Sequence, residues 1–101
     1  MKVDVQALQV KNNTAKHRFE VQLGDSFGVI TYRKTGPVYV MIHTEVPKEF
    51  GGQGIAQHLV HEALEQVGAE HGRIVPLCPV VRAYIQRHPE YQSLVVSMPV
   101  K

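Results

Sequence analysis

Along its first half the chain alternates apolar and polar residues in short runs separated by turn residues, a pattern typical of β-strands. Residues 3–10 form an irregular first run, which predicts an edge strand, and the polar residues 11–14 after it predict a turn. Regular alternation follows over 17–23 and 27–34, on either side of a turn at Gly24. These two runs are predicted to be strands with one buried face.

The next run, Val38–Glu45, is apolar on both of its faces. One face is formed by Val38, Val40 and Ile42, and the other by Tyr39 and Met41. A strand of this kind is expected in the interior of a sheet, with a neighbour on each side. His43 and Glu45 are expected to continue the face of Tyr39 and Met41, because successive side chains of a strand point to opposite faces.

After three glycines the apolar period changes to that of a helix. The apolar stripe consists of Ile55, Leu59, Val60, Ala63, Leu64 and Val67. His58 and His61 lie on the opposite side, and we interpret them as part of a solvated face, since the surrounding residues do not form the HExxH zinc pattern. A short apolar run over 73–77 then predicts another strand.

A second helical pattern begins at Pro79 and is expected to stop at or just before Pro89, because the residue before a proline is disfavoured in the helical conformation. Four strands, a helix, a strand and a helix predict a single α+β (mixed α/β) domain over 1–101. The strand–helix–strand unit over 38–77 implies that its two strands are parallel.

Composition narrows the class of protein. The chain of 101 residues has 44% hydrophobic and 20% charged residues and a formal net charge of +2, which is ordinary for a globular domain. Its basic residues are scattered, so we expect no nucleic-acid partner. We also expect no secretory signal and no membrane span. A single cysteine excludes an internal disulfide and is consistent with a cytoplasmic location.

The three glycines, Gly51, Gly52 and Gly54, lie between the last long strand and the first helix. The first N–H groups of a helix have no partner within the helix, and the helix dipole adds positive potential there. Glycines let an anion approach these groups without meeting a Cβ atom, which predicts a phosphate site. The alternative is a turn that only requires positive φ angles. The stretch lacks the P-loop and GxGxxG patterns.

The sequence GGQGIA at 51–56 resembles the GNAT superfamily signature, Arg/Gln-x-x-Gly-x-Gly/Ala, which binds the pyrophosphate of acetyl-CoA. Gly54 and Ala56 fit this signature, whereas Gly51 stands where the Arg or Gln belongs, so only its backbone is expected to contribute. Together with HTEVP and VPLCPVVRAYIQRHPEY, the stretch resembles a subfamily of very short GNAT-like proteins, the YjdJ type, over about 19–91.

This resemblance implies the acyl-CoA N-acyltransferase fold, a twisted and mostly antiparallel sheet in which two parallel strands splay apart to admit the pantetheine arm. It implies acetyl-CoA as the bound substrate and no metal. The residues implied in binding are Thr44 and Val46 beside the pantetheine arm, and Gly51, Gly52, Gln53, Gly54, Ile55 and Ala56 around the pyrophosphate.

Cys78 is the first candidate for chemistry. Pro79 favours the first position of a helix, which makes Cys78 the expected N-cap, where the helix dipole stabilises a thiolate. A lone cysteine is otherwise a small buried hydrophobe. The resemblance suggests an acetyl-cysteine intermediate at Cys78, near the expected end of the thioester.

Three further residues are candidates. Tyr84 falls near the tyrosine that protonates the departing CoA thiolate in many GNAT enzymes, and the alternative is packing in the core. His43 and Glu45 are candidates for a base or relay beside the amine, or else a solvated strand end. His88 lies about 15 Å along the helix from Cys78, too far for direct proton transfer, and is expected to end the helix.

These observations favour an acetyltransferase that transfers an acetyl group from acetyl-CoA to an amine of a small molecule or a protein. The alternative is a non-catalytic acyl-CoA-binding module or sensor, because only residues 11–16 are available where GNAT enzymes have the helices of the acceptor site. The acceptor site is then open, or built by a homodimer or by a partner. A weaker hypothesis is binding of another nucleotide.

Overall fold

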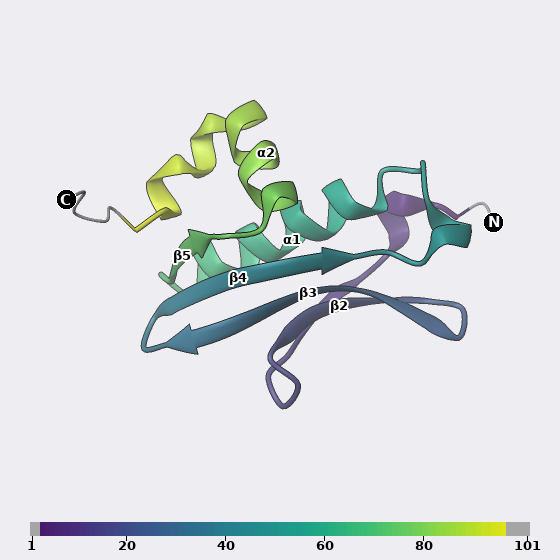
Figure 1. Cartoon of the computed structure of the whole chain (residues 1–101), viewed down its shortest axis with the longest axis horizontal. Helices are drawn as coiled ribbons and strands as arrows, with labels where there is room; N and C mark the ends of the chain where they lie inside the picture. The colour runs from purple at the N-terminus through teal and green to yellow at the C-terminus, as the bar shows by residue number, and fades with distance from the viewer. Residues whose placement is uncertain (1–2, 97–101) are drawn as a thin grey trace.

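The computed structural model describes residues 3–96, whose strands form a five-stranded sheet in the order β1-β2-β3-β4-β5 (Figure 1). The strands are β1 (Val10–Asn13), β2 (Arg18–Leu23), β3 (Ser26–Thr35), β4 (Val38–Glu45) and β5 (Arg73–Pro76). Neighbours are antiparallel from β1 to β4, whereas β4 and β5 are parallel. The mixed α+β class and the parallel strand–helix–strand unit are therefore confirmed.

Two helices, α1 (Ile55–Ala69) and α2 (Pro79–Arg87), lie on the same face of the sheet and contact each other (Figure 1). The predicted apolar stripe of α1 is buried along its whole length. As predicted, α2 begins directly after Cys78 and ends before Pro89. Short 3₁₀ segments cover Val5–Ala7, Lys48–Phe50 and Pro89–Leu94.

The prediction for the N-terminal segment is wrong. Val5–Ala7 is a 3₁₀ turn, and the first strand begins only at Val10 and includes residues expected to form a turn. The reason is side-chain pairing across the sheet, since Asn12 accepts a hydrogen bond from the Tyr32 hydroxyl (2.5 Å) and donates one to the Tyr39 hydroxyl (3.3 Å). These partners stabilise a polar residue in a strand, and alternation of hydrophobicity cannot detect them.

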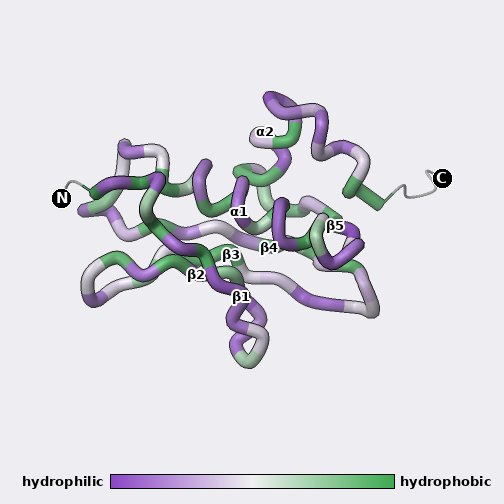
Figure 2. The backbone as a smooth tube through the Cα atoms, turned by 180° about the vertical axis from the view of Figure 1, so that it is seen from behind, coloured by the Kyte–Doolittle hydropathy of each residue, from purple (hydrophilic) through white to green (hydrophobic). Residues whose placement is uncertain are grey.

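The core lies between the inner face of the sheet and the helices, where Figure 2 shows green, apolar segments of β2 and β3 beside α1. The sheet contributes Phe19, Val21, Leu23, Ile30, Tyr32, Tyr39 and Met41, all buried. The rings of Tyr32 and Tyr39 meet edge to face at 4.8 Å, and the Tyr39 hydroxyl donates a hydrogen bond to the Glu70 carboxylate (2.8 Å). The aromatic cluster thereby ties the sheet to the end of α1.

Stability at high pH is expected to depend on Tyr39. Burial, aided by the Glu70 carboxylate, raises the pKa of Tyr39 from 10.0 to about 12. Between about pH 10 and 12 the unfolded chain therefore releases this proton while the folded chain keeps it, and the free energy of unfolding falls as the pH rises through that window. Urea titrations at several pH values in this window should show that the free energy of unfolding falls less with pH for Tyr39→Phe than for the unsubstituted chain. An equally steep fall would contradict the assignment to Tyr39.

β4 carries one extra residue, Ile42, opposite the junction of Thr31 and Tyr32. Tyr32 pairs with Met41, but Thr31 pairs with His43, so the register shifts by one. A β-bulge of this kind interrupts the alternation of side chains along one strand. Residues after Ile42 therefore lie on the faces opposite to those that strict alternation predicts.

The bulge overturns the predicted orientation of two candidate residues. His43 and Glu45 pair with Thr31 and Val29 and lie on the outer face of the sheet, not on the face of Tyr39 and Met41. Thr44, paired with the buried Ile30, lies on the helix-covered face instead. The prediction that β4 lies inside the sheet is confirmed by its pairing with β3 and β5, although Ile42 on its outer side is 42% exposed.

Candidate functional site where β4 and β5 part

The parallel strands separate at Met41. Their pairing runs from Val38 and Arg73 to Met41 and Pro76. The backbone N–H groups of Leu77 and Cys78 then both donate to the Met41 carbonyl, each at 3.0 Å, and the chain enters α2 while β4 continues to Glu45. Within residues 3–96, the last part of β4 thus has a paired strand on the β3 side alone.

The glycine turn follows β4 and the 3₁₀ segment Lys48–Phe50. Gly52 and Gly54 have φ angles of +77° and +85°, which favour glycine, whereas Gly51 has an ordinary φ of −68°. Positive φ angles, which the alternative interpretation requires, are therefore present at two of the three glycines. Apart from the adjoining residues of the chain, no heavy atom lies within 4 Å of where a Cβ would stand at Gly52 or Gly54, so space for an anion exists beside both.

Gly54 is the N-cap of α1, and its carbonyl accepts the first helical hydrogen bond, from the His58 N–H at 3.0 Å. The N–H groups that precede this bond, at Ile55, Ala56 and Gln57, lie in the first turn of the helix, where intrahelical partners are missing. A cavity of about 230 Å³ lies against this turn. It is lined by Val46, Phe50, Gly51, Gly52, Gly54, Ile55, Ala56 and Gln57.

Most of the residues implied in cofactor binding therefore gather around one cavity. Gln53 differs, because its side-chain oxygen accepts a hydrogen bond from the Val3 N–H at 2.9 Å and thus points toward the N-terminal segment. Thr44 also lies elsewhere, beside Cys78. The side chain of Ile55 is buried in the core, so the backbone of this residue is what it presents to the cavity.

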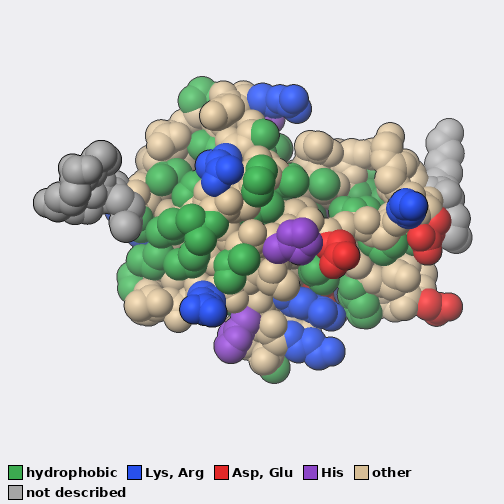
Figure 3. Space-filling view, viewed as in Figure 1, with side chains coloured by type: hydrophobic (Ala, Val, Ile, Leu, Met, Phe, Trp, Pro, Cys, Tyr) green, Lys and Arg blue, Asp and Glu red, His purple; other side chains and the backbone are tan. Residues whose placement is uncertain are grey.

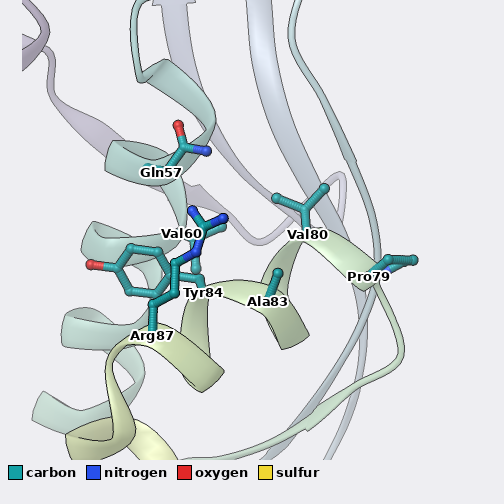
Figure 4. Close-up of a pocket in the computed structure, with 7 residues that line it drawn as sticks. All are labelled: Gln57, Val60, Pro79, Val80, Ala83, Tyr84 and Arg87. Atoms are coloured by element: carbon teal, nitrogen blue, oxygen red, sulfur yellow. The ribbon is translucent and has the colours of Figure 1, made fainter.

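A second cavity, about 290 Å³ in volume, lies between α1 and α2 (Figure 4). Its lining consists of Gln57, Val60, Pro79, Val80, Ala83, Tyr84 and Arg87. Gln57 lines both cavities, so they adjoin at this side chain. Together the two cavities follow the first turns of α1 toward the start of α2.

Cys78 occupies the predicted N-cap position, with Pro79 at the first helical position. Its thiol is buried, at 1% exposure, and its Sγ lies 3.2 Å from the Thr44 hydroxyl oxygen. Sequence reasoning missed this pair, because without the bulge at Ile42 the Thr44 side chain would point to the other face. The structure therefore joins the lone thiol to a hydroxyl group at the point where β4 and β5 part.

Large apolar side chains are exposed around this point. Ile42, Leu77 and Val80 are 42%, 54% and 36% exposed, and they are close in sequence to Met41 and Cys78. In Figure 3 apolar side chains gather on the half of the molecule that holds β5 and α2. The thiol itself is buried, whereas the apolar side chains next to it in sequence, Leu77 and Val80, are exposed.

Tyr84 is half-buried, packs against the core and lines the cavity between the helices, so it combines the two predicted environments. Its ring stacks on His88 at 4.2 Å, and its hydroxyl lies 3.1 Å from His61 Nδ1. Burial raises the pKa of Tyr84, and the nearby carboxylates Glu90 and Glu65 raise it further. Tyr84 therefore keeps its proton at neutral pH. His88 ends α2, as predicted.

The interpretation of His58 and His61 as a solvated face is incomplete, since the His61 side chain is 42% exposed but both rings also have hydrogen-bond partners. His58 Nε2 lies 2.9 Å from the Leu8 carbonyl oxygen, and His61 Nδ1 lies 2.9 Å from the Tyr91 hydroxyl. Both partners come from segments remote in sequence, which helical periodicity cannot detect. Among residues 3–96 no group of three or more His, Cys, Asp or Glu side chains is arranged to hold a metal ion. None of the helices in that range has the length and apolar character needed to cross a bilayer.

Comparisons with known proteins identify the family of this chain. A sequence profile described as GCN5-related N-acetyl-transferase matches residues 18–94. Protein NATD1 of Gallus gallus is 32% identical over 90 residues, which cover 86% of this chain and 82% of the relative. Protein NATD1 of Homo sapiens is 31% identical over 90 residues, with 86% and 80% coverage.

A solved structure supports the same fold. The NMR solution structure of a GCN5-like protein from Staphylococcus aureus superimposes with a TM-score of 0.67 at 22% identity, covering 91% of each chain. At this identity the likeness concerns the fold alone. Together with the profile match, it confirms the GNAT-like fold and the resemblance predicted from the sequence.

Proposed function

This chain belongs to the GCN5-related N-acetyl-transferase family, and on that premise we propose that it binds acetyl-CoA and transfers the acetyl group to an amine. The observation that carries the proposal is the succession of three features along one surface. They are the open glycine turn at the start of α1, the cavity between α1 and α2, and the Thr44–Cys78 pair where β4 and β5 part.

Each feature suits one part of acetyl-CoA. The pyrophosphate accepts hydrogen bonds from the N–H groups at the start of α1, where the helix dipole favours negative charge. The pantetheine arm lies along the last part of β4, which has no paired strand on the β5 side among the described residues. The thioester then lies beside Val80, where the cavity between α1 and α2 meets the exposed apolar side chains near Cys78.

Acetyl transfer through Cys78 is the first of two routes. The Cys78 sulfur attacks the thioester carbonyl, the bond from that carbon to the CoA sulfur breaks, and the CoA thiolate takes up the proton released from Cys78. The Thr44 hydroxyl stabilises the attacking thiolate by donating a hydrogen bond to it. An amine then attacks the acetyl-cysteine, which forms the amide and restores the thiol.

In the second route the amine attacks the thioester directly, and Tyr84 protonates the departing CoA thiolate. In both routes the amine loses a proton. His43 and Glu45 lie on the outer face of β4, the side from which an amine can approach the gap without crossing the helices. We propose that they receive this proton, with water between the groups where the distance requires it.

Calorimetric titration tests the binding part of the proposal. Acetyl-CoA and CoA should bind with dissociation constants within about tenfold of each other, because they share the pyrophosphate and the pantetheine arm. ATP should bind at least about tenfold more weakly, since it lacks that arm. Tighter binding of ATP than of CoA would replace this function with nucleotide binding.

A non-catalytic acyl-CoA-binding module remains the second candidate, and one observation favours it. β1 and β2 are joined by a tight turn over residues 14–17, with no helix between them to form an acceptor pocket. The two functions differ in turnover. Release of CoA from acetyl-CoA in the presence of amines supports the enzyme, whereas tight binding without release supports the module.

A further inference from the structure

Four side chains form a continuous hydrogen-bonded network on the helix side of the molecule. The Tyr91 hydroxyl donates to the Glu65 carboxylate at 2.6 Å and lies 2.9 Å from His61 Nδ1. The same His61 nitrogen lies 3.1 Å from the Tyr84 hydroxyl. Glu65 and His61 belong to α1, Tyr84 to α2 and Tyr91 to the 3₁₀ segment Pro89–Leu94, so the network joins three elements.

Counting protons determines the direction of each hydrogen bond. A phenol has one proton, and Tyr91 uses it on Glu65, because a carboxylate only accepts. The Tyr91 oxygen must then accept from His61, which requires a proton on Nδ1. A protonated Nδ1 cannot accept a hydrogen bond from Tyr84. The Nδ1–H is therefore shared between the Tyr91 and Tyr84 oxygens, both of which accept it. The proton of Tyr84 itself points away from His61.

We propose that His61, Tyr91 and Glu65 are positioning residues that keep the Tyr84 proton available for the departing CoA thiolate. This inference rests on the proposed acetyl transfer and gives Tyr84 its role within the direct route. The proton passes from the Tyr84 oxygen to the CoA sulfur, directly or through one water. The phenolate that remains is stabilised by the hydrogen bond from His61 Nδ1 until water returns a proton to it.

The location of Tyr84 fits this role. Its ring lines the cavity between the helices and also a neighbouring hollow that contains His61 and His88. Figure 4 shows the side chain extending from α2 across to α1, with its hydroxyl on the α1 side. Tyr84 thus joins the space in which the thioester is expected to the hydrogen-bonded network behind it.

Several charged or titratable groups surround the phenol. Burial raises the pKa of Tyr84, and Glu90 and Glu65 add to that rise by disfavouring a negative charge on the oxygen. His88 stacks on the ring, and Arg87 lines the same cavity. The two carboxylates disfavour the phenolate form of Tyr84. The Nδ1–H of His61, which is in hydrogen-bond contact with the Tyr84 oxygen, favours it.

The tautomer of His61 is the first test, and it requires no substrate. Long-range proton–nitrogen NMR spectra of the unsubstituted protein, recorded about two pH units above the usual histidine pKa, should show the Nδ1–H form. Tyr91→Phe removes the acceptor, so His61 should shift mainly to the Nε2–H form and accept the Tyr84 proton. An Nε2–H form in the unsubstituted protein would overturn the proposal.

The second test follows CoA release in a single turnover between about pH 8 and 12, a range that includes the region above 10 where the raised pKa of Tyr84 lies, with hydroxylamine as a small acceptor and with enzyme-free rates subtracted. His61→Leu should lower the rate of CoA release on its pH plateau roughly tenfold or more. It should also move the decline of this rate at high pH to a higher pH, because loss of the Nδ1–H raises the pKa of Tyr84. A merely structural role would lower the plateau without moving the decline. In a Tyr84→Phe background, His61→Leu should have no further effect on the rate.

His58→Leu is the matched control, since His58 lies on the same helix but contacts the Leu8 carbonyl instead of Tyr84. It should leave the high-pH decline unchanged. If the unsubstituted protein releases CoA and His61→Leu behaves like His58→Leu, the inference is wrong while the proposed function stands. If acetyl-CoA does not bind in calorimetry, the proposed function is wrong, and so is the role proposed for the network.

Discussion

Cys78→Ala is expected to abolish an acetylated form of the protein that acetyl-CoA alone produces. A thiol at a helix N-terminus beside a bound thioester should accept the acetyl group, because transfer between two sulfur atoms is nearly isoenergetic and needs only a thiolate and proximity. Intact mass spectrometry should show one acetyl group on the unsubstituted protein, removable by hydroxylamine, and none on the variant. Binding of CoA should change by less than about tenfold, since it depends mainly on backbone contacts.

The hydroxyl beside the thiol offers a matched pair of controls. Thr44 lies 3.2 Å from the Cys78 sulfur, so Thr44→Val, which removes the donor at nearly constant shape, should slow acetylation about tenfold or more. Thr44→Ser keeps the hydroxyl and should retain most of the rate. Turnover of an amine by Cys78→Ala at the unsubstituted rate would refute the covalent route and leave direct attack assisted by Tyr84.

Gly54→Val should weaken acetyl-CoA binding by about 100-fold or more, equivalent to about 2.7 kcal/mol. A side chain at this position would extend into open space beside the first turn of α1, where the phosphate is expected. Its φ angle of +85° is also strained for a β-branched residue, by about 1–2 kcal/mol. Calorimetry at a temperature where circular dichroism shows a folded protein measures the loss of affinity.

Two controls separate the loss of space from the strain. Gly36, in the turn between β3 and β4, has a φ of +57° and also has open space where a Cβ would stand. Gly36→Val should therefore destabilise the fold similarly while leaving affinity within about twofold. Gly51→Ala, at an ordinary φ, should reduce affinity far less than Gly54→Val. Equal losses for the two site variants would mean that the phosphate lies elsewhere.

Much of the fold could be predicted because its determinants are local. The stripe of α1 from Ile55 to Val67, the alternation of β2 and the proline that opens α2 are each contained within one element, and the structure agrees with all three. The glycine turn belongs to the same group, since positive φ angles at Gly52 and Gly54 are a property of the backbone at those residues.

The failures share another cause, because each depends on residues that are distant in sequence or on an irregular register. β1 extends into the predicted turn because Asn12 finds partners on β3 and β4. His61 has a hydrogen-bond partner because Tyr91, 30 residues later in the sequence, packs against α1. Hydrophobic periodicity describes how one element is oriented, not which polar side chains meet across elements.

The amino-acid sequence by itself determined the order of the elements, the family resemblance, the glycine turn and the position of Cys78 at the start of α2. Only the tertiary structure decided which side chains share a site. The single extra residue in β4, Ile42, sends His43 and Glu45 to the outer face and brings Thr44 to Cys78. A bulge forms from the pairing of two strands, so one strand's pattern cannot reveal it, and every side chain beyond it changes face.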